Sequence, residues 1–166
     1  MLKLLLYSLL ILAATNGFAQ TIDSLTQPSP VKTLTLKQYI ALQNGDDLYN
    51  MAQSGALNHY PLPGNVLKFK KELDLSPVQT TKLTTIDTEL LRKKKEMGVF
   101  IIRNEKAIDS LFRTRKANDG KVIFYTNRYG IYQGELRNAI LQACLSTQKL
   151  LTPKQITMFE RLYYKY

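Results

Sequence analysis

The chain has 166 residues, 45% of them hydrophobic, with 23 Lys and Arg against 13 Asp and Glu and a formal charge of +10 at pH 7. This length fits one domain with a removable leader, and the hydrophobic content excludes wholesale disorder. There is one His and one Cys, and we find no motif for a nucleophile or a phosphate loop. We therefore expect a binding protein and not an enzyme.

The first 19 residues have the three parts of a secretory signal peptide. Lys3 is the positive region, residues 4–14 are the apolar region, and residues 17–19 are a small-x-small cleavage site. The apolar run is too short to span a bilayer, which argues against the alternative of an uncleaved anchor. We expect export to the periplasm of a Gram-negative cell. An exported basic chain rarely meets nucleic acid, so we expect protein or membrane-surface partners.

Residues 20–33 are polar and contain two prolines, so we expect a flexible tether ahead of a single helical domain over residues 34–166. The helix starts are marked by capping boxes, in which a Ser or Thr and a Gln three residues later satisfy each other's backbone N–H groups. The boxes are Thr35 with Gln38, Ser76 with Gln79, and Thr152 with Gln155. The predicted helices cover residues 35–54, 64–73, 76–116, 120–149 and 153–164.

The two long predicted helices carry apolar or small residues at the 3-4 spacing of a helical seam. Lys93 and Asn104 interrupt the first seam, and residues 118–120 form a turn signal between the helices. This pattern predicts an all-α fold, an extended antiparallel helical hairpin with flanking short helices. Too little chain remains to cover both sides of such a hairpin, so we expect a homodimer. The seam residues are Leu83, Ile86, Leu90, Met97, Phe100, Ala107 and Leu111, then Val122, Tyr125, Tyr129, Tyr132, Leu136, Ala139 and Ala143.

A pentapeptide of the form Leu-Ser/Thr-Pro-x-Gln precedes the first long helix and the final helix. Each copy is explained as a helix start, with proline at the favoured first position. Its residues are Leu75, Ser76, Pro77 and Gln79, then Leu151, Thr152, Pro153 and Gln155. Two copies in an exported helical chain also resemble the L-T-x-x-Q family of periplasmic proteins, the Spy and CpxP group. Segments 57–67, 105–112, and 134–137 with its continuation at 150–156 resemble the heavy-metal sensor and zinc-resistance branch of that group.

The resemblance covers about residues 45–166 and implies an all-α hairpin, a dimer, a periplasmic address and no catalytic residues. It further implies a protein of the envelope stress response, an ATP-independent chaperone that binds unfolded or acidic envelope proteins. The alternative is a heavy-metal sensor or metal-resistance protein that acts on the sensor domain of a membrane-bound signalling partner. A purely structural envelope protein is a third hypothesis.

Candidate metal ligands are few. The resemblance places ligands at three positions that are Asn65, Ile140 and Cys144 in this chain, and only Cys144 is a competent one. The lone His59 lies in a predicted loop. We expect no cofactor, with His59 and Cys144 as the weak candidates for holding a metal ion. Cys144 lies in an apolar helical stretch, so we expect a buried thiol, with an intermolecular disulfide as the alternative.

Basic residues gather in three runs, which we expect to form a cationic surface that attracts acidic clients. The alternative is a solvated helical face that only keeps the protein soluble. Four consecutive residues wrap most of a helix, so residues 92–95 cannot all face one partner. The candidate binding residues are Lys68, Lys70, Lys71, Arg92, Lys93, Lys94, Lys95, Arg113 and Arg115.

Overall fold

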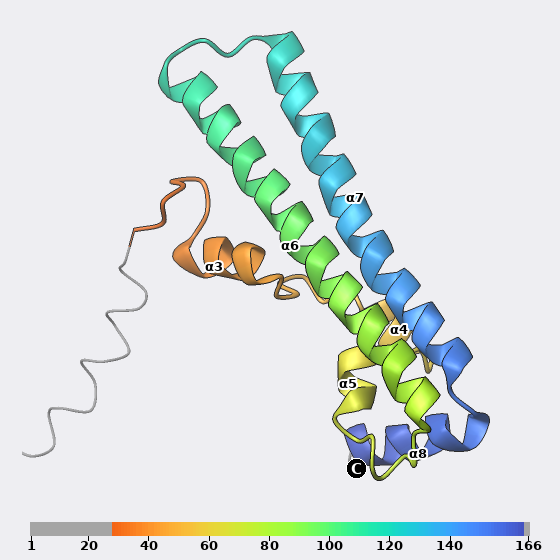
Figure 1. Cartoon of the computed structure of the whole chain (residues 1–166). Helices are drawn as coiled ribbons and strands as arrows, with labels where there is room; N and C mark the ends of the chain where they lie inside the picture. Colours follow the sequence, from red (N-terminus) through yellow and green to blue (C-terminus); the bar gives the residue numbers. More distant parts are fainter. Residues whose placement is uncertain (1–27, 165–166) are drawn as a thin grey trace, which may run out of the picture.

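A computed structural model of the chain describes residues 28–164, and this part is helical without a strand (Figure 1). The expected signal peptide over residues 1–19 lies outside the described residues, as does the tether up to residue 27. The helices are α3 (Leu36–Asn44), α4 (Gln53–Ala56), α5 (Pro63–Leu67), α6 (Pro77–Arg113), α7 (Asp119–Leu150) and α8 (Pro153–Tyr163).

Two long helices, α6 and α7, pack against each other in antiparallel orientation and confirm the predicted hairpin. At 1.5 Å per residue, the 37 residues of α6 span about 55 Å. The turn between the helices uses Arg115, whose φ is 56°, and the Asn118 side chain, which caps α7 by accepting from the Lys121 N–H. Figure 1 shows the turn end of the hairpin projecting beyond all the other helices.

The predicted seam forms the main core between the two long helices. Leu90, Met97 and Ile101 of α6 are buried against Leu136 and Ile140 of α7. Asn104, which interrupts the apolar pattern, is buried as well. Its side-chain N–H donates to the Tyr125 carbonyl oxygen at 3.1 Å, so the polar break in the seam links α6 to α7. A single buried amide of this kind favours one register of the helix pair over others.

The predicted helix over residues 35–54 is wrong in extent, because α3 ends at Asn44. Gly45 follows with φ 76°, the left-handed conformation that commonly ends a helix. The Asp47 carboxylate then accepts from the backbone N–H groups of Met51 and Ala52. These local bonds replace helical ones and hold a turn, after which only the short α4 forms.

The predicted helix over residues 64–73 is also shorter, because α5 ends at Leu67 and turns follow. Asp74 closes this segment with φ 47°. The three capping boxes are all present, with Thr35, Ser76 and Thr152 as the capping residues. The three capped helix starts were therefore predicted correctly, whereas the start of α4 and the early ends of the first two predicted helices were not.

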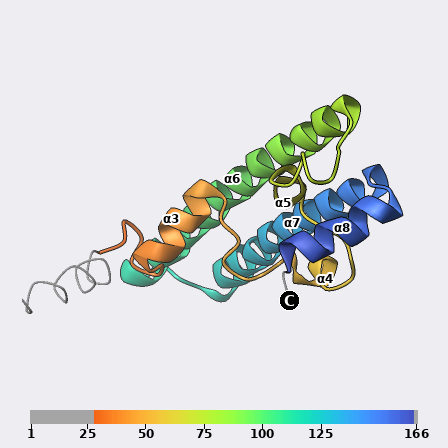
Figure 2. The same ribbon diagram turned by 90° about the horizontal axis from the view of Figure 1, so that it is seen from below.

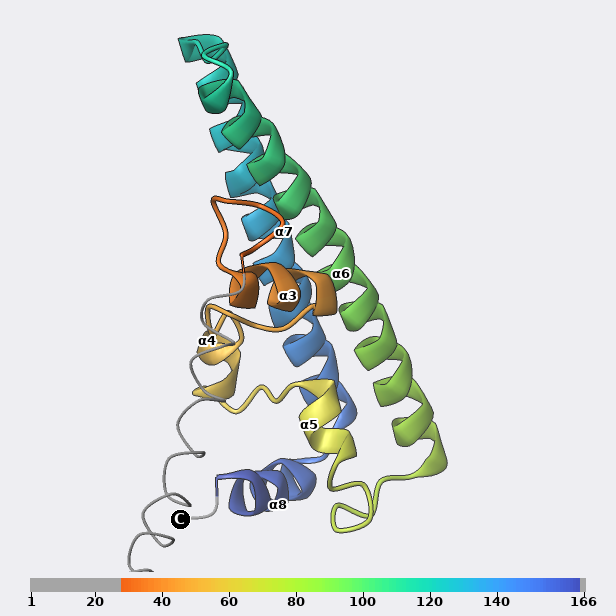
Figure 3. The same ribbon diagram turned by 90° about the vertical axis from the view of Figure 1, so that its left-hand side faces the viewer.

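The short helix α3 crosses the middle of α6 (Figure 1, Figure 3). Gly98 of α6 makes this crossing possible, because a Cβ atom there would lie 1.9 Å from the Leu42 carbonyl oxygen. Val31, within the expected tether, is buried in the same core. The chain therefore contacts the core already at Val31, whereas Pro28, Pro30, Lys32 and Thr33 of the expected tether are exposed.

A second core closes the base of the hairpin, where α8 folds back under the ends of α6 and α7 (Figure 1, Figure 2). Phe159 of α8 is buried with Val66, Leu73, Leu83 and Leu151. None of the helices in residues 28–164 has the length and apolar character needed to cross a membrane.

Replacing Gly98 with alanine is expected to lower the free energy of unfolding by about 2 kcal/mol, because α3 must move away from α6 to admit the methyl group. Gly130→Ala is the matched control, since a Cβ there meets nothing within 4 Å. It should raise stability by about 0.5–1 kcal/mol through helix propensity. Urea unfolding followed by circular dichroism measures both. Equal effects of the two substitutions would contradict the close α3–α6 contact.

Candidate binding surface

The two Leu-Ser/Thr-Pro-x-Gln motifs meet in space at the base of the hairpin, through Gln79 and Gln155. The Gln79 amide N–H donates to the Gln155 side-chain oxygen at 2.9 Å, and Gln155 donates back to Gln79 at 3.2 Å. Each amide donates a second bond to the backbone of the opposite motif region. Gln79 donates to the Leu150 carbonyl oxygen at 2.8 Å, and Gln155 donates to the Leu73 carbonyl oxygen at 3.2 Å.

Each glutamine therefore has two structural tasks. Its oxygen accepts from the backbone N–H of its own capping residue, Ser76 or Thr152, at 3.0 Å. Its NH₂ group joins the start of one helix to the start of the other. Every donor and acceptor of the partly buried amide pair is used, which is the condition for a polar contact to stabilise a core. These hydrogen bonds link the two motifs, and we call the pair Gln79 and Gln155 the clasp.

An open groove runs between α6 and α7 on a face that no other described helix covers. Its volume is about 420 Å³, and its lining residues all come from these two helices. α3 packs on a different face of α6, around Leu91 and Lys94. The apolar floor of the groove comes from seam positions. These are Ile86, Leu90 and Met97 of α6 with Ala139 and Ala143 of α7.

The rim of the groove is polar and carries both signs of charge. Glu89 and Lys93 line it on the α6 side, and Glu135 lines it on the α7 side with Asn138 and Gln142. An apolar floor with a polar rim is the general anatomy of a protein-binding surface. The seam spacing predicted the floor residues. It did not predict that small side chains at positions 139 and 143 would leave the seam open on one side.

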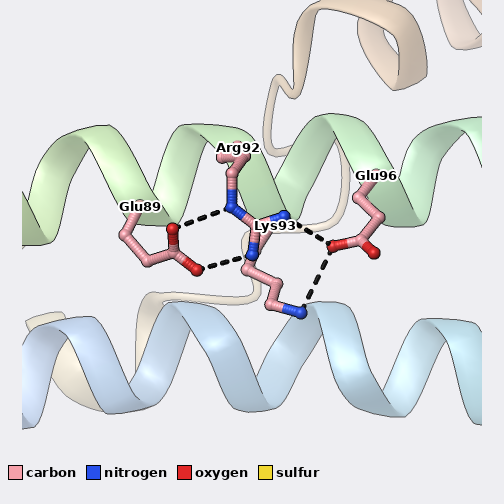
Figure 4. Close-up of polar contacts among 4 residues, drawn as sticks. All are labelled: Glu89, Arg92, Lys93 and Glu96. Atoms are coloured by element: carbon pink, nitrogen blue, oxygen red, sulfur yellow. Dashed lines mark hydrogen bonds and ion pairs between the residues drawn. The ribbon is translucent and has the colours of Figure 1, made fainter.

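Part of the expected cationic surface is neutralised within α6. The Arg92 guanidinium makes a bidentate pair with Glu89, at 2.7 and 2.8 Å (Figure 4). Arg92 and Lys93 both contact Glu96 at 3.2 Å. The hydrogen bond from Arg92 lowers the pKa of the Glu89 carboxyl. Two cations and two carboxylates make this cluster neutral, and Figure 4 shows Lys93 pointing toward α7.

The remaining candidate cations lie in separate regions. Lys68 and Lys94 line a cavity of about 350 Å³, together with the carboxylates of Asp47 and Asp87. Lys70 and Lys71 lie on exposed turns near the base of the hairpin, since α5 ends before them. The last two candidates, at the opposite end of the hairpin, are Arg113 and Arg115. The structure therefore does not bring the nine residues together on one surface.

His59 and Cys144, the candidates for holding a metal ion, lie in different parts of the described structure. The exposed His59 ring, on a residue with φ 68°, bonds to the Glu160 carboxylate and so ties the loop before α5 to α8. Cys144 is buried in the main core with 1% of its surface exposed. Within residues 28–164, no group of three or more His, Cys, Asp or Glu side chains is placed to hold a metal ion.

Comparison of the chain with protein-family models, with characterised proteins and with solved structures found no match.

The clasp predicts that Gln79→Glu lowers the free energy of unfolding by about 2–3 kcal/mol, because a carboxylate cannot donate to Leu150 or to Gln155. Gln38→Glu is the matched control. Gln38 occupies the same place in the α3 capping box and bonds only with Thr35, so the change there should stay within about 0.5 kcal/mol. Urea unfolding at pH 7 measures both. Equal losses of unfolding free energy in the two variants would mean that the glutamines stabilise the protein by capping helices and not by bonding between the motifs.

Burial raises the pKa of the Cys144 thiol to about 11, so the thiol stays protonated at pH 8. The thiolate is the reactive form. We expect alkylation by iodoacetamide at pH 8 to be at least a hundredfold slower in the folded protein than in 6 M urea. A disulfide-linked dimer on a non-reducing gel of the native protein would contradict the burial of this side chain.

Proposed function

We propose that the protein is a periplasmic, ATP-independent chaperone that holds apolar segments of unfolded envelope proteins in the α6–α7 groove. The observation that carries this proposal is the uncovered groove itself, with its apolar floor and charged rim. Its volume of about 420 Å³ accommodates a few apolar side chains. The resemblance to the Spy and CpxP group and the expected signal peptide support the same assignment.

The mixed charge of the rim suits a reversible binder of many clients. Lys93 and Glu89 lie within one turn of each other, and Glu135 faces them from α7. A client segment with either sign of charge beside its apolar residues finds an opposite charge on the rim. The net positive charge of the chain speeds encounter with acidic clients, an effect that salt screens.

A homodimer is part of the same proposal. A two-fold interface must be self-complementary, and a rim that carries both carboxylates and an ammonium group meets that condition. In this arrangement a second copy covers the groove until a client replaces it. No arrangement of ligands in residues 28–164 favours the alternative of a metal sensor, so we propose no metal-dependent function.

Ala139→Glu places a carboxylate on the groove floor and is expected to reduce the suppression of client aggregation at least fivefold. The matched control is Asn127→Glu, which adds the same charge at an exposed position of the same helix. The assay adds the protein to a reduced, unfolding client without ATP, at low and at high salt, with and without chelator. Circular dichroism establishes that both variants are folded.

Wild-type suppression should survive the chelator and weaken with salt, and the control should match the wild type. The proposal fails if Ala139→Glu suppresses aggregation as well as the wild type does. It also fails if suppression requires added metal.

A further inference from the structure

The turn end of the hairpin exposes large apolar side chains that no described part of the protein covers. We define the hairpin tip as residues 109–128. Within it, Phe112 is 59% exposed, Ile123 is 60% exposed and Phe124 is 51% exposed. Phe112 lies one residue before the end of α6, and Ile123 and Phe124 lie four and five residues after the start of α7. At 1.5 Å per residue, all three are within about 8 Å of these helix ends along the helix axes. Apolar side chains gathered in this way mark an interaction surface.

The same tip is strongly basic. Five cations stand against the two carboxylates of Asp109 and Asp119, a net charge of +3 in residues 109–128. Asp109 pairs with Arg113, and the Arg128 guanidinium lies 5.2 Å from the centre of the Phe124 ring. The cations are Arg113, Arg115, Lys116, Lys121 and Arg128. The ligand that fits this tip is therefore anionic and offers an apolar environment next to its charges.

The shape of the tip distinguishes between two such ligands. Two helix ends, each about 10 Å across, present an area of about 200 Å². A stable protein interface needs about 800 Å² on each partner. A bilayer surface is fluid and needs no matching shape, and apolar side chains enter it to a depth of about 5–10 Å, which matches the depth of the exposed residues. Figure 1 shows α3 beside the middle of the hairpin and α4, α5 and α8 toward its base, so none of these helices obstructs an end-on approach to the tip.

We propose that the hairpin tip binds the surface of membranes that contain anionic phospholipids. Phe112, Ile123 and Phe124 enter the region between headgroups and acyl chains, while the five cations contact the phosphate groups. The tip and the α6–α7 groove are separate surfaces, because the groove begins on α7 at Glu135. Attachment to a membrane through the tip does not cover the groove.

The test is sedimentation of the protein, prepared without the expected signal peptide, with vesicles of phosphatidylcholine that contain either no phosphatidylglycerol or 30% of it. Binding is expected with the anionic vesicles, at least tenfold tighter than with phosphatidylcholine alone, and weaker in high salt. Arg115→Glu together with Lys116→Glu should abolish it. The charge control is Lys70→Glu together with Lys71→Glu, which makes the same change in net charge at exposed positions near the other end of the molecule.

The apolar contribution is tested separately. Phe112→Ser together with Phe124→Ser should weaken vesicle binding at least tenfold, because the cations alone do not insert. Val78→Ser is the control, since Val78 is also exposed but lies at the base of α6. Circular dichroism establishes that every variant is folded.

Three outcomes would overturn the proposal. One is wild-type protein that does not sediment with anionic vesicles. Another is an equal loss of binding in the tip and base charge variants, which would mean that net charge and not the tip is responsible. The third is tip-dependent binding to polyglutamate without binding to vesicles, which would assign the tip to acidic proteins.

Discussion

The mutual hydrogen bonding of two glutamine side chains, Gln79 and Gln155, holds the base of this molecule together. It joins the start of α6 to the start of α8, and it also ties Gln79 to the last residue of α7. The bond from Gln79 to Leu150 sets the distance between the start of α6 and the end of α7. The second core, built around Phe159, packs directly beside the clasp. The groove farther along the hairpin depends on this separation, because its walls are the two helices themselves.

The α6–α7 groove and the hairpin tip are uncovered because the hairpin is long. A hairpin of this length has more seam than the short helices α3, α4, α5 and α8 can cover. α3 packs on α6 where Gly98 permits close approach, α5 packs on α6 near Asp87, and the groove side stays open. The tip extends beyond every covering helix, so its apolar side chains remain exposed. The two surfaces differ in charge, since the groove rim is mixed and the tip is basic, and they therefore suit different partners.

Net charge alone is a poor guide to where this protein is cationic. Arg92 and Lys93 belong to the longest basic run of the sequence, yet Glu89 and Glu96 neutralise them within the same helix (Figure 4). Such pairs at i, i+3 and i, i+4 are set by helical geometry and add little stability on an exposed face. Their main effect is to cancel the positive charge of Arg92 and Lys93. The tip, farther along the chain, keeps a net charge of +3, because its five cations face only two carboxylates.

The sequence by itself determined the helical class, the two long helices and the three capped helix starts, because capping and seam periodicity are local properties of the chain. It also predicted the burial of Cys144 from the apolar residues around it. Only the tertiary structure decided that Gly98 meets Leu42, that Gln79 meets Gln155, and that the seam is open on one side. Each of these depends on contacts between residues far apart in the chain, which no local pattern encodes. The nine candidate cations illustrate the same limit, since spacing places charges on helices but packing decides which of them share a surface.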